Sequence, residues 1–294
     1  MKPAQYDYFA PTSVDEAVQT LNSYDGEAKP LAGGQSLVPL LNLRLSAPRA
    51  LVDLRRLHAL RSGVEENGFL SMGALTTHGE ALGNPVVRAR LPALAEALRW
   101  IGHPAIRNAG TVGGSIAHAD PAAELPTVLT LVEGEVSVSG VAGSRRIPAE
   151  KLFAGFFTTT LAPDEILTAV HWPLTDVAPG HSTGWGFREV ARRHGDFCLV
   201  AAAALVAVDP RGCISCARIA LAGVGDRPLR LRSTEKILVG EFPGEKELRN
   251  AAEAAVGTLR TSTDIHASAE YRQHLAKVLT YQVLADGARR ARET

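Results

Sequence analysis

A short segment with two adjacent glycines, between a predicted strand and a predicted helix, most constrains the fold of this chain. It reads Leu-Ala-Gly-Gly-Gln-Ser-Leu at 31–37, after a strand expected at Ala28–Leu31 and before a helix expected near 37–45. Without two Cβ atoms, backbone N–H groups can approach a pyrophosphate closely, and the helix N-terminus adds partial positive charge. The segment therefore predicts a phosphate-binding turn. The alternative is a plain glycine turn in which Ser36 caps the helix, with Pro39 tolerated in its first turn.

A second glycine-rich segment, at Asn108–His118, reads NAGTVGGSIAH. We predict another turn, with a hydroxyl side chain on each side of its glycine pair. A helix should follow at Pro121–Val132, with Asp120 as its N-cap. Two separated phosphate sites suit a dinucleotide better than a mononucleotide. Neither segment is GxGxxG or GxxxxGK[ST], so a Rossmann site and a P-loop are both disfavoured.

The first half of the chain mixes short strands and helices. The strand at 28–31, the following helix and a second strand at Ala50–Asp53 predict a small βαβ unit, preceded by a helix from about Ser13. Ser13 and Glu16 have the spacing of a capping box, in which both side chains accept hydrogen bonds from free backbone N–H groups. A second, α+β unit should follow, and its expected elements are a strand at Phe69–Gly73, helices at Pro92–Ile101 and Pro121–Val132, and a strand at Glu135–Val141.

The pattern changes after Pro173. Thr175–Ser182 contains Pro179 and Gly180 and is predicted to be a linker. The elements expected after it are strands at Gly184–Val190, Leu199–Val208 and Ile214–Ala222, and helices at Glu245–Leu259 and Ser268–Arg290. The last helix is predicted to be amphipathic, with one face formed by Tyr271, Leu275, Val278, Leu279 and Gln282. We therefore expect one domain at 1–174, with subdomains of about 1–56 and 57–174, and a second domain at 180–294.

Charge and cysteine content limit the possible partners and compartments. Lysine plus arginine and aspartate plus glutamate both number 31, so the formal net charge is zero and nucleic acid is a disfavoured partner. The three cysteines are sparse and odd in number, which argues against a disulfide framework and fits a reducing compartment. Residues 1–9 lack the apolar core of a signal peptide, and no run of about 18 apolar residues follows. We expect a cytoplasmic protein with no transmembrane segment.

Cys213 and Cys216 have the CxxC spacing of a metal-binding pair. One pair without a second is an incomplete set for zinc or for an iron–sulfur cluster, so we expect these residues to have a structural role. The nine histidines show no metal-ligand spacing. The sequence therefore predicts no metal site in this chain.

Four segments, taken together and in order, resemble a known family. They are AGGQSLVPLLNLRL at 32–45, IRNAGTVGGSIAHADPAAELP at 106–126, DEIL at 164–167 and FREVARRHGDF at 187–197. This set resembles the FAD-binding medium subunit of the xanthine dehydrogenase and carbon monoxide dehydrogenase family of molybdenum hydroxylases, over nearly the whole chain. The resemblance implies an α+β fold, in which a two-subdomain FAD-binding domain of the PCMH type is followed by a small C-terminal domain of antiparallel sheet plus helices.

The resemblance also implies which residues bind the cofactor. The segments 32–36 and 111–115 would be the two loops that hold the FAD pyrophosphate, Glu124 would accept hydrogen bonds from FAD hydroxyls, and Arg188 would lie near the flavin ring. Some relatives carry an aromatic residue in place of Ile101, and this departure weakens the case for ring stacking there. The full set of implied cofactor-binding residues is Ala32, Gly33, Gly34, Gln35, Ser36, Leu37, Ile101, Gly102, Gly110, Thr111, Gly113, Gly114, Ser115, His118, Glu124, Ile166, Leu167 and Arg188.

Several nearby residues also have plain structural interpretations. Asp120 is expected to be a helix cap rather than a ligand, and Glu124 could simply occupy a first helical turn, where the helix dipole favours it. Phe187 alternates with Trp185 on one face of a strand, so we expect it in the core. The charged turn at 192–196 would ordinarily be a solvated loop, and the resemblance makes it a candidate flank of the flavin or of the path to the electron acceptor.

The function implied by the resemblance is that of the FAD-carrying electron-transfer subunit of a heteromeric molybdenum hydroxylase. The chain has too few cysteines for even one Cys₄ cluster, so its electrons would come from other chains. The molybdopterin would reside on a large molybdenum-cofactor subunit and the clusters on a small [2Fe-2S] subunit, in a dimer of heterotrimers. Substrate hydroxylation would take place there, with no catalytic residue from this chain.

Two other interpretations stay open at this point. A self-sufficient NADPH-dependent flavin reductase of similar fold would act on its own substrate, and it would need a catalytic proton donor and a substrate-phosphate site. A nucleotide-sensing or scaffold protein would bind a ligand at the glycine-rich loops without redox turnover.

Overall fold

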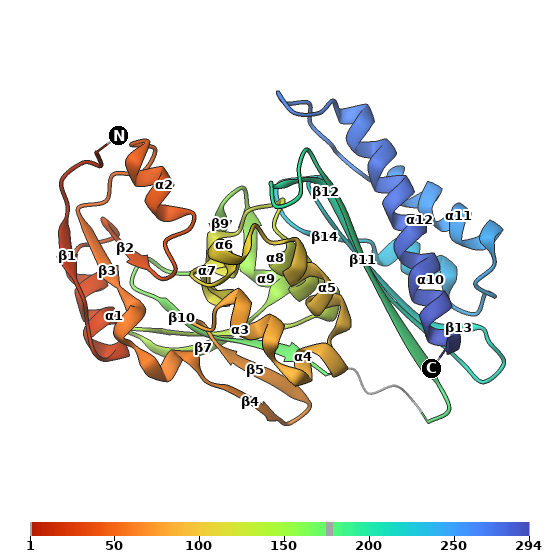
Figure 1. The fold of residues 1–294 in the computed structure, drawn as a ribbon, viewed down its shortest axis with the longest axis horizontal. Coiled ribbons are helices and arrows are strands. Elements are labelled where there is room, and N and C mark those ends of the chain that lie inside the picture. Colours follow the sequence, from red (N-terminus) through yellow and green to blue (C-terminus); the bar gives the residue numbers. More distant parts are fainter. Residues whose placement is uncertain (1, 175–178, 294) are drawn as a thin grey trace.

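The computed structural model describes residues 2–174 and 179–293. Figure 1 shows three sheet-containing units side by side: an N-terminal unit in red and orange, a central unit, and a C-terminal unit in green and blue. The predicted α+β architecture, with a smaller antiparallel C-terminal part, is confirmed. Residues 175–178 of the predicted linker lie outside the described residues.

The N-terminal unit is a parallel sheet with the strand order β1-β3-β2. Strands β2 (Ala28–Leu31) and β3 (Ala50–Asp53) lie at the predicted residues and are joined through α2 (Leu37–Asn42), so the βαβ unit is confirmed. Sequence patterning missed β1 (Asp7–Phe9), because all three of its side chains are exposed. The unit is completed by α1 (Val14–Ser23), η1 (Leu54–Arg56) and η2 (His58–Arg61).

The start of α1 agrees only in part with the predicted capping box. Ser13 Oγ accepts a hydrogen bond from Glu16 N (3.1 Å), as predicted. The Glu16 carboxylate, however, accepts from Thr12 N (2.8 Å) rather than from Ser13 N. The second half of the prediction was therefore wrong, because the chain before the helix turns so that the N–H one residue earlier faces Glu16.

The central unit is an antiparallel sheet with the strand order β4-β5-β10-β6-β7, and helices α7 and α8 pack on β10. Its strands are β4 (Gly63–Glu66), β5 (Phe69–Gly73), β6 (Glu135–Gly140), β7 (Gly143–Pro148) and β10 (Ile166–Pro173), with a separate pair formed by β8 (Phe153–Gly155) and β9 (Thr158–Thr159). Its helices are α3 (His78–Gly83), α4 (Pro85–Arg90), α5 (Pro92–Trp100), α6 (Pro104–Arg107), α7 (Val112–His118), α8 (Glu124–Val132) and α9 (Ala149–Leu152).

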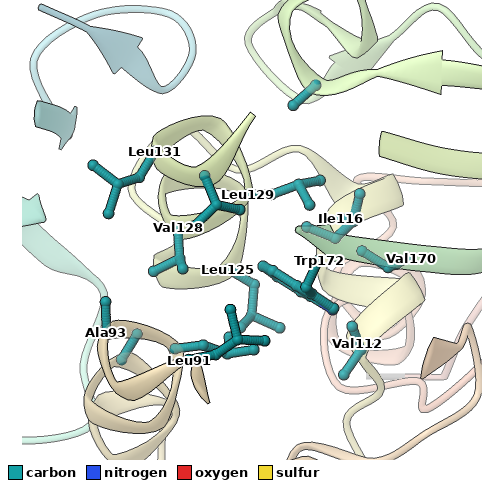
Figure 2. Close-up of a cluster of buried hydrophobic side chains, with 14 of the residues drawn as sticks. Leu91, Ala93, Val112, Ile116, Leu125, Val128, Leu129, Leu131, Val170 and Trp172 are labelled. Carbon is teal, nitrogen blue, oxygen red and sulfur yellow. The ribbon is translucent and has the colours of Figure 1, made fainter. Parts of the chain in front are cut away.

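Trp172 of β10 anchors the core between this sheet and its helices. Figure 2 shows its ring between Leu125 of α8 and the α7 side chains Val112 and Ile116. All four side chains are almost fully buried. A fully buried tryptophan packs a large apolar area, so this contact fixes α7 and α8 relative to the sheet.

Two predictions in the central unit were wrong. Helix α8 begins at Glu124, with Ala123 as its N-cap, rather than directly after Asp120. Asp120 Oδ1 instead accepts a hydrogen bond from Ala122 N (2.8 Å), so it closes a turn ahead of the helix. Residues 112–118, predicted as a turn, form α7.

The C-terminal unit is an antiparallel sheet in the order β11-β12-β13-β14, with one face on the central unit and the other covered by helices (Figure 1). Its strands are β11 (Ser182–Ala191), β12 (Cys198–Val208), β13 (Ile214–Ala222) and β14 (Leu229–Arg230), and its helices are α10 (Arg232–Leu238), α11 (Glu245–Val256) and α12 (Ala269–Glu293). The three predicted strands and two predicted helices are present. Sequence patterning missed β14 and α10, which are short.

Helix α12 packs closely on the sheet. A Cβ atom at Gly186 of β11 would lie 2.6 Å from the carbonyl oxygen of Val283 in α12, so only glycine permits this approach. The predicted helix face was partly wrong, because Tyr271 is exposed while Leu275 is buried. Half of the buried residues of α12 are small, namely Ala276, Thr280, Gly287, Ala288 and Ala291, and the other half are Arg272, Leu275, Leu279, Val283 and Leu284.

Among the helices in the described part of the chain, none combines the length and the apolar character needed to cross a lipid bilayer.

Candidate cofactor site

The structure brings the two predicted glycine-rich segments into direct contact. A Cβ atom at Gly33 would overlap the carbonyl oxygen of Ala109 and lie 2.9 Å from Gly110 Cα. A Cβ atom at Gly114 would lie 3.6 Å from the Cβ of Ala32. The backbones of two segments far apart in sequence therefore meet, and at Gly33 only glycine allows it.

The first segment leaves backbone donors free. Gly34 has a left-handed backbone (φ +72°), and the N–H groups of Gly34, Gln35 and Ser36 donate no hydrogen bond to any residue that the structure describes. The predicted Ser36 cap is absent, because Ser36 already has helical backbone angles and its hydroxyl makes no capping bond to α2. Three N–H groups and one hydroxyl are thus available to an anion, which is the donor set that a phosphate group requires.

The second segment uses its donors internally. Thr111 caps α7 by accepting from Gly114 N (3.1 Å), while Val112 N donates to Thr76 O and Gly113 N to Ala74 O, both at 2.9 Å. Helix formation here satisfies the N–H groups that an open turn would have exposed. Among its predicted binding residues, the segment therefore offers side-chain hydroxyls more readily than backbone N–H groups. The Ser115 side chain is half-buried at this helix.

His78 contacts the second segment, and the sequence analysis did not predict this contact. Its Nε2 lies 3.0 Å from Thr111 O, and a Cβ atom at Gly110 would lie 3.0 Å from its ring. Burial lowers the pKa of His78 to about 4, so the ring is neutral near pH 7 and Nε2–H donates to the Thr111 carbonyl. The only signal in the sequence was the adjacent capping box of Thr77 and Glu80, which starts α3.

The segment at Ile101 and Gly102 is held from two sides. Nη1 of Arg107 donates to the carbonyl oxygens of both residues at 3.0 Å. The charged turn at 192–196 lies against it, since a Cβ atom at Gly195 would be 3.1 Å from the Gly102 carbonyl. The rings of Trp100 and His194 also stack, with centroids 5.1 Å apart. The charged turn therefore contacts a predicted flavin segment through Gly195 and His194, while Arg192 and Arg193 are exposed to solvent.

An acidic cluster lies where the C-terminal unit meets the start of α8. Burial raises the pKa of Glu124 to about 7 and that of Glu189 to about 8, and each acid sits near a further carboxyl group. Burial also raises the pKa of Asp120 and of the Cys198 thiol. Cys198 Sγ lies 3.1 Å from Ala122 O, so this strand residue contacts the turn that precedes α8 directly.

Four other predicted residues are placed differently. Ile166 and Leu167, at the start of β10, are both buried and belong to separate core clusters. Arg188 lies on the face of β11 that is turned to α12, where it pairs with Asp286 at 2.8 Å. The structure therefore does not bring Arg188 to the other predicted residues. The His118 ring packs against Phe157, with centroids 5.1 Å apart.

Within residues 2–174 and 179–293, no group of three or more His, Cys, Asp or Glu side chains is arranged to hold a metal ion. Cys213 and Cys216 are free thiols, and the backbone N–H of Cys213 donates to Asp209.

The buried acids predict how the stability of the cofactor-free chain depends on pH. Because their folded pKa values are raised, Glu124 and Glu189 keep protons that the unfolded chain has released, so stability falls as pH rises toward 8. His78 has the opposite sign, since its stability contribution is lost as pH falls from 6.5 toward 4. Burial also lowers the pKa of His118 and His171, so these rings act with His78 and partly offset the acids near pH 6.5. Between about pH 7 and 8 the acids dominate, and we expect a net loss of about 1 kcal/mol, measured by urea unfolding.

Glu189→Gln should remove a large part of this loss, because the amide does not titrate. If the free energy of unfolding of the wild-type chain did not fall with pH, or fell equally steeply in the variant, these carboxyl groups would not keep their protons in the folded chain.

Two family models match the chain in sequence order. The FAD binding domain in molybdopterin dehydrogenase matches residues 4–175, and the CO dehydrogenase flavoprotein C-terminal domain matches residues 185–286. These are the parts of the chain that contain the glycine-rich segments and the antiparallel sheet, respectively.

Relatives and solved structures match this chain over nearly its full length. The chain is 39% identical to the 6-hydroxypseudooxynicotine dehydrogenase complex subunit alpha of Paenarthrobacter nicotinovorans, over 100% of this chain and 98% of that protein. A chain of carbon monoxide dehydrogenase from Hydrogenophaga pseudoflava superposes with a TM-score of 0.94 at 35% identity, covering 99% of this chain and 100% of that chain. A chain of quinoline 2-oxidoreductase from Pseudomonas putida 86 gives 0.93 at 38% identity, covering 99% of both. This chain belongs to the family of FAD-binding medium subunits of molybdopterin-containing dehydrogenases.

Proposed function

We propose that this chain is the FAD-carrying electron-transfer subunit of a heteromeric molybdenum hydroxylase, passing electrons from a partner's iron–sulfur clusters to an external acceptor. The observation that carries the proposal is the match of both family domains, in order, over residues 4–175 and 185–286. Bound FAD supplies the ability to exchange electrons singly or in pairs. The alternative of a self-sufficient NADPH-dependent reductase has no support in these relatives, which are named as subunits or chains of dehydrogenases and hydroxylases.

The residues present fit this cofactor. The free N–H groups of Gly34, Gln35 and Ser36 would hold the pyrophosphate, with hydroxyls from Ser36 and Ser115 beside them. The Glu124 carboxyl group, at the start of α8, suits the hydroxyls of a neutral ligand part, because it accepts hydrogen bonds as the anion and can also donate one when protonated. The residues of this chain would thus bind and orient FAD. Arg107 and His78 hold the segments around Ile101 and Thr111 in place.

The proposed partners are inferred from the relatives and from the small number of cysteines in this chain. The relatives include a carbon monoxide dehydrogenase medium chain and a nicotine 6-hydroxylase medium subunit, and their names indicate multi-subunit enzymes. We propose a large molybdenum-cofactor subunit and a small [2Fe-2S] subunit as partners, assembled as a dimer of heterotrimers in the cytoplasm. The three cysteines of this chain are too few for a Cys₄ cluster, which supports placing the clusters elsewhere.

We also propose a domain division at the linker, with a FAD-binding domain at 1–174 and a C-terminal domain at 180–294. The separate sheets on either side of this linker support it. Within the first domain, the change from the parallel sheet to the antiparallel sheet after η1 and η2 supports subdomains of about 1–56 and 57–174.

The nature of the cofactor gives a direct test. The purified chain should be yellow and should release FAD, not FMN, on denaturation, because the two glycine-rich segments meet and the free N–H groups at 34–36 suit the two phosphates of a dinucleotide. Chromatography of the released flavin makes the measurement, after reconstitution with FAD and FMN in equal amounts. Recovery of FMN, or of no flavin, would remove the basis for the proposed function.

A further inference from the structure

Two adjacent phenylalanines form the tip of the short hairpin β8–β9 in the central unit. Phe156 and Phe157 connect Gly155 to Thr158, which pair with each other across the hairpin. Both aromatic residues are largely exposed, at 60% and 57%. Tight turns favour glycine, proline, asparagine, aspartate and serine, so the turn itself does not account for two exposed aromatic rings.

The backbone of Phe157 lies in the left-handed region (φ +49°), which bulky side chains rarely adopt and which glycine adopts at much lower cost. The turn is nevertheless held in place. The Thr158 hydroxyl donates to Phe156 O (2.8 Å), and the base of the hairpin is anchored by the buried side chains of Leu152 and Phe153. A disfavoured backbone conformation that the surrounding structure maintains is typical of residues that contact a ligand.

The position of Phe157 connects this tip to the glycine-rich segments. Its ring packs on that of His118, the last residue of α7, with centroids 5.1 Å apart and planes tilted by 45°. Strand β9 lies beside this helix (Figure 1). Residues 114 and 118 are four positions apart, so they share one face of α7, and the His118 side chain leans back toward the helix N-terminus.

That face of α7 is the one that meets the first glycine-rich segment. A Cβ atom at Gly114 would lie 3.6 Å from the Cβ of Ala32. Four residues of an α-helix span about 6 Å along its axis, so the pair of His118 and Phe157 begins about one helical turn from the contact between the two segments. An exposed aromatic ring therefore lies close to the predicted phosphate site.

The chemistry of FAD matches this arrangement. The free N–H groups at 34–36 suit the phosphates. FAD carries a planar ring system at each end, adenine and isoalloxazine, and a ribose or a ribityl chain separates each ring from the pyrophosphate. Such rings stack favourably on aromatic side chains, so a stacking partner is expected at a short distance from the phosphate donors. Phe157 is placed at such a distance.

We infer that Phe157, supported by His118, is a ring-stacking residue of the cofactor site and packs against one of the two planar rings of FAD. The inference rests on the proposed function, since it takes FAD as the ligand. It accounts for an aromatic side chain at a turn position that favours glycine, and for the exposure of its ring when the base of the hairpin is buried.

The experiment compares Phe157→Gly and Phe157→Tyr with the wild-type full chain, using FAD as the probe. Dissociation constants come from the change in flavin fluorescence, and thermal unfolding is followed without FAD. Phe157→Gly should weaken FAD binding about tenfold or more, because stacking is lost. Its Tm should stay within about 3 °C of wild type, because glycine relieves the left-handed backbone. Phe157→Tyr should bind within about threefold of wild type, since it keeps the aromatic face.

Competition with ADP decides which ring of FAD stacks, because ADP carries adenine and two phosphates but no isoalloxazine. If Phe157→Gly loses affinity for ADP and for FAD by the same factor, Phe157 stacks on the adenine. If ADP affinity is unchanged and the visible flavin bands shift in the variant, Phe157 stacks on the isoalloxazine. Both results support the inference.

The matched control is Phe242→Gly, which removes a ring of similar exposure (58%) before α11 in the C-terminal unit. It should leave FAD affinity and the flavin bands unchanged. Wild-type FAD affinity in a folded Phe157→Gly variant would overturn the inference, leave the proposed function intact and favour a partner subunit as the cover of this tip. A Phe157→Tyr variant as weak as Phe157→Gly would contradict the stacking role. Failure of the wild-type chain to bind FAD would instead overturn the proposed function.

Discussion

Replacing Gly33 by alanine should strip FAD from the protein, with occupancy after purification falling below about a tenth of the wild-type level. The added Cβ atom would overlap the carbonyl oxygen of Ala109 and come within 2.9 Å of Gly110 Cα. Both contacts are to backbone, so no side chain can rotate away and the two glycine-rich segments must separate. The free N–H groups at 34–36 would then move relative to the rest of the site.

The size of this effect follows from the kind of bond lost. Hydrogen bonds from N–H groups to a charged phosphate contribute about 1.5–3 kcal/mol each, so losing two of them weakens binding at least about a hundredfold. Gly83→Ala is the matched control, because a Cβ atom there meets nothing within 4 Å. Far-ultraviolet circular dichroism checks that both variants fold. Wild-type FAD content in a folded Gly33→Ala variant would mean that the contact between the segments does not shape the site.

The sequence predicts best those strands and helices whose own residues show a regular apolar pattern. Strands β2, β5 and β13 lie at the predicted residues, because apolar alternation or a buried run is bounded there by glycine, proline or polar residues. Strand β1 has no such pattern, since it is held by backbone pairing to β3 while its side chains stay exposed. No local rule identifies a strand that depends only on a neighbour far along the chain.

The second glycine-rich segment shows how tertiary contacts override local preference. Gly113 and Gly114 disfavour a helix by about 1 kcal/mol each, which is why a turn was expected. The carbonyls of Ala74 and Thr76, just after the end of β5, accept hydrogen bonds from the first N–H groups of α7, and Thr111 caps this helix. A Cβ atom at Gly113 would lie 2.8 Å from Ala74 Cα, so the glycines serve close packing there as well.

The site itself could be predicted in part. The segments at 32–37 and 110–115 do meet, as two loops of one site should. Arg188, suggested by the family resemblance, lies on the other face of β11, while its neighbour Glu189 faces the FAD-binding domain. Strand alternation could have indicated this, because Trp185 and Phe187 were already expected on one core-facing side. His78 could not have been found in this way, since its role depends on a backbone contact to Thr111.

The second large effect concerns the source of electrons. FAD-loaded chain on its own should not be reduced by any organic substrate of such enzymes, and reduction should become rapid only in the co-expressed complex. The first glycine-rich segment offers free N–H groups, and the described residues hold no metal-binding cluster of His, Cys, Asp or Glu side chains. Three cysteines cannot bind a Cys₄ cluster, which supports the proposal that the iron–sulfur clusters lie in other chains, together with the centre that oxidises the substrate.

The measurement mixes the FAD-loaded chain with N-heterocycles, aldehydes or NADPH in the absence of oxygen and follows the visible absorbance of the flavin. Dithionite is the positive control, because it reduces any accessible flavin and shows that the bound cofactor is redox-active. Bleaching of the isolated chain by an organic substrate at a rate similar to that of the complex would overturn the subunit assignment. Rapid bleaching by NADPH would favour a self-sufficient reductase instead. Slow reduction by NADH agrees with the assignment, since an electron-transfer subunit that delivers electrons to a nicotinamide acceptor must also run in reverse.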